Sequence, residues 1–245
     1  MINKLELIFK SMADPKEILA NFALNYIYKY NIIGLGTGKT IRKLIETISF
    51  DSFSNKLFLT SSIDSEILIS QKGLNVISLF SGLLPDIYID SFDSLLHDNK
   101  NKNFIMIKGG GGALTREKIL AYNAKFRVFI GEETKMVKNP RYVSVPIEVV
   151  SPAVSYVIKK MELFGIRVRI RDGNGKIGPT ISDNGNIILD AEIRPDELYS
   201  FSEKIREIPG VIETGIFTSN LYDLIILGSD DGRIQIIEEG KASSS

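Results

Sequence analysis

The chain has 245 residues, and its 30 Lys and Arg residues balance its 30 Asp and Glu residues. This balance removes the simplest argument for nucleic acid or an anionic membrane surface as a partner. The absence of cysteine excludes disulfides, thiol catalysis and thiolate metal sites, and no apolar run approaches the ~20 residues that a membrane helix needs.

The N-terminal residues Met1 to Lys10 carry charges among their apolar positions and do not form a signal pattern. We therefore expect a soluble protein of the cytoplasm. His97 is the only histidine, and it begins a polar stretch, 97–103, that predicts a mobile loop with a solvated imidazole. Histidine metal sites and serine triads are poor candidates, so acid–base chemistry is expected from carboxylates, lysines or tyrosines.

The first elements are predicted to be a helix, a strand and a second helix. Asp14 followed by Pro15 is typical of a helix start, and apolar residues at helical spacing extend this helix to about Lys29. Asn31 to Leu35 predicts a short buried strand, which runs into the turn Gly36 to Thr40. A glycine turn between a strand and a helix places backbone amides at a helix N-terminus, where they bind anions.

The residues of this turn that are expected to bind phosphate are Thr37, Gly38, Lys39 and Thr40. Two nucleotide motifs fail on the turn by one residue each. A P-loop needs a glycine at the position of Ile33, and the dinucleotide fingerprint needs one at the position of Lys39. A phosphate site is therefore predicted, but a nucleotide is not indicated.

The next strands alternate with helical patterns, and several of them lack a polar face. They are predicted at Lys56 to Thr60, Asp86 to Asp90, Phe104 to Lys108 and Phe126 to Ile130. This alternation favours a Rossmann-like α/β domain with a parallel, doubly wound sheet. Ligands bind such sheets at the carboxyl ends of the strands.

Three predicted strand ends carry polar residues that we expect to converge at one sheet edge. The first is the phosphate turn, the second holds Asp90 and Asp93, and the third is Lys108 with the glycines that follow it. A magnesium site at the two aspartates is a lower-ranked alternative, because Mg²⁺ more usually sits between carboxylates and nucleotide phosphates.

The stretch from Phe104 to Leu120 combines several residues that are typical of a ligand site. Lys108 precedes four glycines, and Glu117 falls in the first turn of the helix that follows. Four glycines cost backbone entropy, so they favour a loop whose amides a small anionic ligand approaches closely. A plain tight turn and an ordinary first-turn acid are the alternatives left open.

The second half of the chain predicts a ferredoxin-like unit with the order β-α-β-β-α-β. Its elements are expected at Pro146 to Val150, Ala153 to Phe164, Ile166 to Ile170, Asn186 to Asp190, Pro195 to Ile208 and Val211 to Phe217. Two further strands are expected to return to the first domain. The predicted domains are 1–145 with 219–239 for the Rossmann-like domain, 146–218 for a ferredoxin-like lid, and 240–245 as a disordered tail.

These motifs resemble those of the type A family of ribose-5-phosphate isomerases. The resemblance extends over nearly the whole chain, and its specific block is IKGGGGALTREK at 107–118. The other matching segments are GLGTGKT at 34–40, DIYID at 86–90, GEETK at 131–135, PIEVV at 146–150, DNGN at 183–186, IPGV at 208–211 and LYDLIILG at 221–228.

The resemblance implies that the chain interconverts ribose 5-phosphate and ribulose 5-phosphate through a cis-enediolate, without a metal or organic cofactor. It implies that Glu117 is the base and that Lys108, with the amides of Gly109, Gly110 and Gly111, stabilises the enediolate oxygen. Asp90 would shuttle protons and help to open the sugar ring.

The resemblance also assigns residues that hold the substrate. Asp93 would hold the sugar, while Thr37 to Thr40 and Lys135 would take the phosphate, with Lys16 as a further candidate. The implied partner is a phosphorylated pentose, with neither nucleic acid nor membrane, and the implied assembly is a homodimer or homotetramer.

The chain departs from the family pattern in its acidic loop and in its phosphate turn. Ser91, Phe92 and Ser94 replace a glycine, an alanine and a glutamate, and Lys39 stands where serine is usual. We expect Phe92 to lie beside the sugar and to narrow the pocket or reorient the loop.

Three alternatives to a ribose-5-phosphate isomerase remain, and the first is an isomerase whose sugar-phosphate preference is altered by these departures. A non-catalytic sugar-phosphate sensor would need the phosphate turn but neither Glu117 nor Lys108, and both are present. A P-loop nucleotide hydrolase would use Lys39, Thr40 and Asp90, but the glycine that it needs is missing.

Overall fold

The computed structural model describes residues 4–8, 14–173, 175 and 177–238, and the chain divides into two compact units. Unit 1 consists of Met1–Phe92, Arg116–Met136 and Thr218–Ser245, and unit 2 consists of Asp93–Thr115 and Val137–Phe217. The units divide the chain at other residues than those expected, since 93–115 and 137–145 fall in unit 2. The predicted tail 240–245 lies outside the described residues.

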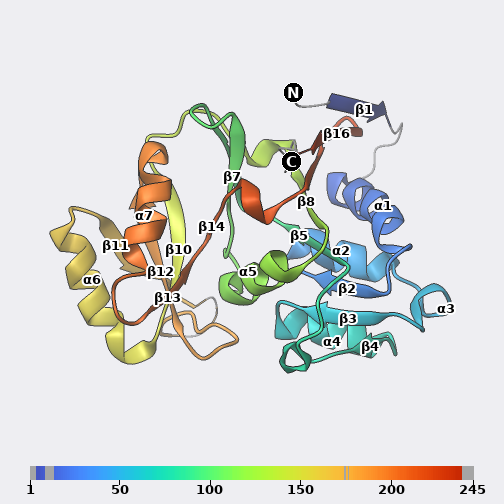
Figure 1. Cartoon of the computed structure of the whole chain (residues 1–245), viewed down its shortest axis with the longest axis horizontal. Coiled ribbons are helices and arrows are strands. Elements are labelled where there is room, and N and C mark those ends of the chain that lie inside the picture. Colours follow the sequence, from blue (N-terminus) through green and yellow to red (C-terminus); the bar gives the residue numbers. More distant parts are fainter. Residues whose placement is uncertain (1–3, 9–13, 174, 176, 239–245) are drawn as a thin grey trace, which may run out of the picture. The chain divides into compact units, whose positions relative to one another are not determined.

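Among the described residues, unit 1 contains one sheet of eight strands (Figure 1). Their order is β1 (Lys4–Ile8), β16 (Arg233–Glu238), β15 (Leu224–Gly228), β8 (Arg127–Glu132), β5 (Ile87–Ser91), β2 (Ile32–Leu35), β3 (Leu57–Thr60) and β4 (Asn75–Val76). The strands from β15 to β4 are parallel, while β16 and β1 are antiparallel additions at one edge. The parallel sheet confirms the predicted α/β class, and β15 and β16 join unit 1 as expected.

The helices of unit 1 bury apolar side chains. They are α1 (Pro15–Ile27), α2 (Lys39–Thr47), α3 (Phe50–Phe53), α4 (Ile63–Gln71) and most of α5 (Leu114–Asn123). Helix α1 begins where the sequence predicts, because the Asp14 side chain accepts the Lys16 N–H at 3.0 Å. Its buried Leu19 and Ile27 share one core with Ile33 of β2. Each such side chain contributes about 1.5–3 kcal/mol on burial.

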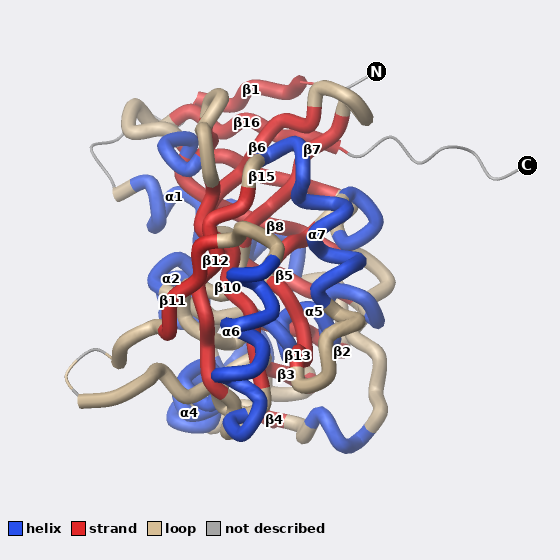
Figure 2. The backbone as a smooth tube through the Cα atoms, turned by 90° about the vertical axis from the view of Figure 1, so that its left-hand side faces the viewer, coloured by secondary structure: helices blue, strands red, loops and turns tan. Residues whose placement is uncertain are grey.

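Unit 2 contains the predicted ferredoxin-like sheet. Its strand order is β11 (Arg167–Ile170), β12 (Ile187–Ile193), β10 (Val143–Val149) and β13 (Val211–Thr214), and all neighbours are antiparallel. Helices α6 (Val154–Leu163) and α7 (Leu198–Ile205) lie on one face of this sheet (Figure 2). Val157 of α6 and Ile205 of α7 are buried in the same core as Ile147 of β10.

A second sheet of unit 2 corrects one prediction. Its order is β14 (Ile216–Phe217), β7 (Asn103–Ile107), β6 (Ser94–Asp98) and β9 (Met136–Val137), the last at the boundary of the units. The strand expected at Phe104 to Lys108 is β7, but it pairs antiparallel with β6 and β14 and does not belong to the parallel sheet. Contrary to prediction, Lys108 therefore does not follow a strand of the parallel sheet.

The stretch 97–103, expected to be a loop, contains the end of β6, the hairpin turn at 99–102 and the first residue of β7. β6 ends at Asp98, whose side chain accepts hydrogen bonds from the Lys100 backbone N–H at 2.9 Å and from the side-chain Nδ2 of Asn101 at 2.6 Å. These bonds close the turn, which polar residues alone did not distinguish from a longer loop. His97 is exposed, as predicted. Five single-turn 3₁₀ helices occur among the described residues: η1 (Leu79–Ser81), η2 (Glu133–Lys135), η3 (Ser151–Ala153), η4 (Pro195–Glu197) and η5 (Ser219–Leu221).

Candidate active site

The parallel sheet of unit 1 has a switch point between β2 and β5. The chain passes from β2 to β3 on one side, whereas β5 pairs with the other side of β2. Crevices at such points are the usual ligand sites of doubly wound sheets. The Gly36 N–H donates to the Ile89 carbonyl at 2.8 Å, and the Thr37 N–H donates to Asp90 Oδ1 at 3.2 Å. The predicted phosphate turn and the predicted proton shuttle are therefore neighbours.

Backbone geometry explains the glycines of the phosphate turn. A Cβ on Gly36 would lie 1.8 Å from Asp90 Oδ1, so any side chain there would displace the carboxylate. Gly38 is the N-cap of α2 with a φ of 97°, a conformation that favours glycine. A glycine N-cap offers no side-chain acceptor, which leaves the first amides of α2 to bind an anion.

Asp90 is fully buried and is held by a tyrosine that the sequence analysis did not single out. Tyr88 Oη donates to Asp90 Oδ2 at 2.5 Å, and the Ser91 N–H donates to Asp90 Oδ1 at 2.7 Å. Burial, followed by the charges of Asp90 and Glu117, raises the pKa of Tyr88 well above its usual value. Tyr88 therefore stays protonated and acts as a donor. Its position two residues before Asp90, on the same face of the strand, was the available signal.

Glu117 lies in the first turn of α5, as predicted, and its side chain is buried. Its charge acts on Tyr88, so Asp90 and Glu117 are two buried carboxylates that share one tyrosine as neighbour. A solvated first-turn acid, the alternative left open by the sequence, would be exposed. Glu117 is only 3% exposed.

Lys135 and Lys16 converge on a carboxylate at the end of β8. Lys16 Nζ forms an ion pair with Glu132 Oε1, and Lys135 Nζ lies 3.5 Å from Glu132 Oε2. The bond to Glu132 raises the pKa of Lys16. Burial opposes ionisation of Glu132, but the two lysines outweigh it and hold its pKa below the usual value. Both candidate phosphate ligands thus lie beside the same carboxylate.

Phe92 is buried and does not line an open pocket. Its side chain is 1% exposed, and a Cβ added to Gly131 would lie 2.6 Å from its ring. Lys135 Nζ lies 5.8 Å from the ring centroid and donates to the Phe92 carbonyl at 2.8 Å. Phe92 is a core residue, because the glycine of the GEETK segment makes room for it.

Unit 2 carries Lys108, the glycines and Asp93. Lys108 is 2% exposed, and its Nζ lies 5.5 Å from the centroid of the Phe217 ring. The Lys108 N–H donates to the Gly215 carbonyl at 2.8 Å. The Gly110 N–H donates to Asp93 Oδ2 at 2.7 Å, so the second aspartate of the acidic loop binds the glycine stretch. Asp93 therefore contacts the glycine stretch that directly follows Lys108.

A buried network joins two segments that the resemblance had matched separately, PIEVV and DNGN. Glu148 is fully buried and accepts hydrogen bonds from Ser182 Oγ at 2.6 Å, Asn184 Nδ2 at 3.1 Å and Asn186 Nδ2 at 2.9 Å. Thr115 Oγ1 also donates to Glu148. Because Thr115 is in the first turn of α5, this network fixes the start of the helix that carries the predicted base.

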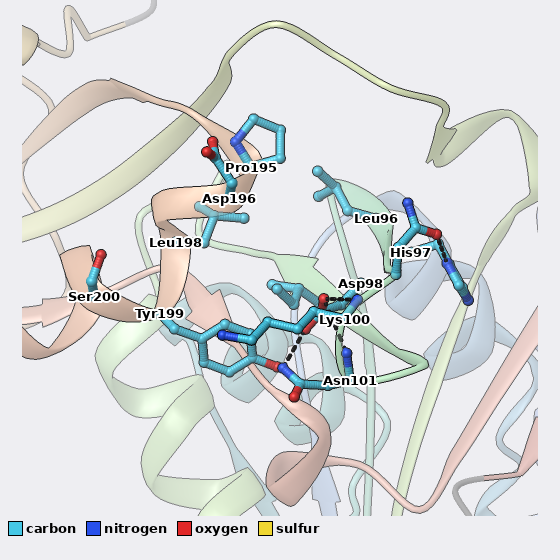
Figure 3. A pocket seen from close by; sticks show the side chains of 12 residues that line it. Leu96, His97, Asp98, Lys100, Asn101, Pro195, Asp196, Leu198, Tyr199 and Ser200 are labelled. Carbon is cyan, nitrogen blue, oxygen red and sulfur yellow. Dashed lines mark hydrogen bonds between the residues drawn. The ribbon is translucent and has the colours of Figure 1, made fainter.

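A cavity of about 470 Å³ lies in unit 2, and none of the predicted site residues lines it (Figure 3). It is lined by the β6–β7 turn and by the start of α7, and Figure 3 shows Tyr199 lying across from Lys100 and Asn101. Burial and the charge of Asp98 raise the pKa of Tyr199. Among the described residues, no group of three or more His, Asp or Glu side chains is placed to hold a metal ion. No helix in the described ranges is long and apolar enough to cross a membrane.

The chain is similar to known proteins over most of its length. The family described as ribose 5-phosphate isomerase A (phosphoriboisomerase A) matches residues 57–232. Ribose-5-phosphate isomerase A of Buchnera aphidicola subsp. Schizaphis graminum is 35% identical over 229 residues, which cover 93% of this chain and 99% of that protein. The protein of the same name from Methanococcus vannielii is 34% identical over 225 residues, or 90% of this chain and 91% of that protein.

Solved structures agree with these sequence comparisons. Ribose 5-phosphate isomerase A of Methanocaldococcus jannaschii superposes with a TM-score of 0.83 at 31% identity, covering 94% of this chain and all of that one. A D-ribose-5-phosphate isomerase in complex with phospho-erythronic acid gives a TM-score of 0.81 at 33% identity, covering 92% of this chain and 98% of that one. The chain therefore belongs to the ribose 5-phosphate isomerase A family.

Proposed function

We propose that this protein is an aldose–ketose isomerase that interconverts D-ribose 5-phosphate and D-ribulose 5-phosphate through a cis-enediolate. The observation that carries the proposal, beside family membership, is the pair of buried carboxylates Asp90 and Glu117 next to Tyr88. Two acids in one buried setting suit a reaction that both removes and relays protons.

Glu117 is proposed as the base that moves a proton between C1 and C2 of the open-chain sugar. Its burial supports this role, because a poorly hydrated carboxylate is a stronger base than an exposed one. A positioned general base typically contributes about 10²–10⁴-fold in rate. Asp90 is proposed to relay protons among the hydroxyls and to help open the furanose ring.

Lys108 and the amides of Gly109 to Gly111 are proposed to stabilise the negative charge that develops on the enediolate oxygen. The burial of the Lys108 side chain supports this, because charge interactions are stronger where water is excluded. Asp93 is proposed to hold the sugar. Its bond to the Gly110 N–H suggests that it also fixes the direction of the glycine stretch.

The phosphate is proposed to bind Thr37, Gly38, Lys39 and Thr40 at the N-terminus of α2, with Lys135 and Lys16 as additional cations. The uncapped start of α2 supports this assignment. Phospho-erythronic acid, bound in a related isomerase, combines a phosphate with a carboxylate that mimics an enediolate. The ligand class proposed for this chain is accordingly a phosphorylated pentose.

The proposal is tested with purified protein, ribose 5-phosphate and a metal chelator, while ribulose 5-phosphate is measured. Turnover that survives the chelator and is inhibited by phospho-erythronic acid supports the isomerase and the absence of a metal requirement. Binding of ribose 5-phosphate without turnover would favour the sugar-phosphate sensor. ATP hydrolysis in place of isomerisation would favour the nucleotide hydrolase.

A homodimer or homotetramer remains a prediction from the family resemblance, and a cytoplasmic location remains a prediction from the sequence. Light scattering coupled to size-exclusion chromatography measures the assembly directly. A particle mass equal to the 27.3 kDa of one chain would contradict it.

A further inference from the structure

One side chain supports the backbone of the glycine loop, which we define as Gly109 to Gly112. Arg171 Nη1 donates to the Gly109 carbonyl at 2.7 Å and to the Gly110 carbonyl at 2.9 Å. Arg171 directly follows β11 and lies 62 residues from Gly109 in the sequence. The family resemblance assigned it no role.

The Arg171 guanidinium is itself held in place. Arg171 Nε donates to Asp190 Oδ2 at 3.0 Å, and Nη2 donates to Asp190 Oδ1. This bidentate pair fixes the plane of the guanidinium, and Asp190 is buried within the sheet of unit 2. The Arg171 backbone is fixed as well, since its N–H donates to the Ile188 carbonyl at 2.9 Å.

The two carbonyl contacts determine where the loop amides point. In a planar trans peptide the C=O of one residue points opposite to the N–H of the next. Anchoring the Gly109 and Gly110 carbonyls on one cation therefore directs the N–H groups of Gly110 and Gly111 away from Arg171. The Gly110 N–H donates to Asp93 Oδ2, so the Gly111 N–H is the one of the two that is directed toward the enediolate oxygen in the proposed site. A stretch of glycines would otherwise sample many backbone conformations.

We infer that Arg171 is a positioning residue for the amides that stabilise the enediolate oxygen. Arg171 binds the carbonyl side of the glycine loop. Its charge polarises the Gly109–Gly110 and Gly110–Gly111 peptide groups, so that their N–H groups become better donors. This inference rests on the proposed function, because it assigns Arg171 to the oxyanion site of that reaction. Asp190 orients Arg171 in turn.

The test compares Arg171→Met with Arg169→Met. Arg169 is a matched control, because it lies on β11 and approaches the same Asp190 Oδ2 at 3.8 Å, but its side chain is 78% exposed. For Arg171→Met we expect kcat to fall about 10- to 100-fold with little change in KM, somewhat less than on deleting an oxyanion donor outright. Affinity for phospho-erythronic acid should fall in parallel. Arg169→Met should leave all three quantities near their wild-type values.

Folding and positioning are separated by further variants. Arg171→Met removes the closest cation from buried Asp190, so Arg171→Met/Asp190→Asn, which also removes the buried charge, is measured beside it with circular dichroism and thermal unfolding. Arg171→Ala is assayed with added guanidinium at non-denaturing concentrations. Saturable recovery of kcat supports positioning, because a guanidinium ion bound in the vacated site restores the contacts to both carbonyls.

The outcomes distinguish this inference from the proposed function. If the wild type does not isomerise ribose 5-phosphate, the proposed function fails and this inference fails with it. If the wild type is active and the folded double variant keeps wild-type kcat, the inference alone is overturned. A rise in KM without loss of kcat would also overturn it, since it would assign Arg171 to ground-state binding.

Discussion

At the residue scale, the proposed base Glu117 is the group whose substitution is expected to separate chemistry from binding most clearly. Glu117→Gln keeps the size of the buried side chain and removes its basicity. We expect kcat to fall by about 10²–10⁴-fold, the typical contribution of a general base, while affinity for phospho-erythronic acid changes little. Steady-state kinetics and a binding titration measure the two effects.

The matched control for this substitution is Glu66→Gln. Glu66 is also an acid in the first turn of its helix, α4, but its side chain is exposed. It should behave as wild type. Near-wild-type kcat in Glu117→Gln would remove Glu117 from the role of base.

Tyr88 offers a second prediction at this scale, through its hydrogen bond to Asp90. Tyr88→Phe deletes the donor at 2.5 Å from Asp90 Oδ2 without changing the ring. Since that bond holds the Asp90 carboxylate in place, we expect kcat to fall about 10-fold, while affinity for phospho-erythronic acid changes little. Steady-state kinetics and a binding titration measure the two effects. Tyr122→Phe, at a tyrosine that is 73% exposed, is the control, and an unchanged kcat in Tyr88→Phe would contradict the assigned donor role.

The sequence supported Glu117, Asp90 and Lys108 as candidates because each occupies an unusual position in a recognisable motif. It did not single out Tyr88 or Arg171. Tyr88 resembles any aromatic residue of a buried strand until its hydroxyl is seen to meet Asp90. Arg171 contacts the glycine loop across 62 residues of sequence, and a contact of that range leaves no local pattern.

At the scale of elements, Lys56 joins the end of α1 to the start of β3. Its Nζ donates to the Tyr28 carbonyl at 2.6 Å and to the Tyr30 carbonyl at 2.5 Å. Burial lowers the pKa of Lys56 below 10.5. Between the folded pKa and pH 10.5, the unfolded chain therefore binds more protons at Lys56 than the folded chain does. In this window Lys56 makes the free energy of unfolding rise as the pH rises, and this contribution is lost as the pH falls through the folded pKa.

Lys56→Met should remove this dependence on pH. It should also lower the free energy of unfolding by about 1–3 kcal/mol, because two carbonyls lose their donor. Urea unfolding between neutral pH and pH 10.5 measures both effects. Lys72→Met controls for the lost backbone bonds, since Lys72 donates to the Glu46 carbonyl at 3.0 Å and the Ile48 carbonyl at 2.9 Å at the end of α2. A pH dependence in Lys56→Met equal to that of wild type would contradict the assignment.

The elements were predicted more accurately than their pairing. The strand at Phe104 to Lys108 exists as β7, but an unbroken apolar run looks the same in a parallel sheet and in a buried antiparallel one. Its partner β6 was hidden because His97 and Asp98 made the strand end resemble a loop. In the ferredoxin-like unit the order of elements restricts the pairing to few arrangements, so the expected topology agrees with the observed one.

At the scale of the whole molecule, two cores must fold from a chain that passes between the units four times, at 92/93, 115/116, 136/137 and 217/218. Because neither unit is a single continuous segment, loss of one unit frees loops that belong to the other. We expect one cooperative thermal transition.

Leu19→Ala and Met161→Ala each remove a fully buried side chain, the first from the core of unit 1 and the second from that of unit 2. Each should cost about 2–5 kcal/mol. For each variant, far-UV circular dichroism and tyrosine fluorescence should report one transition at the same Tm, and that Tm should be lower than in the wild type. Two separate transitions, each moved by only one of the substitutions, would show that the units unfold independently.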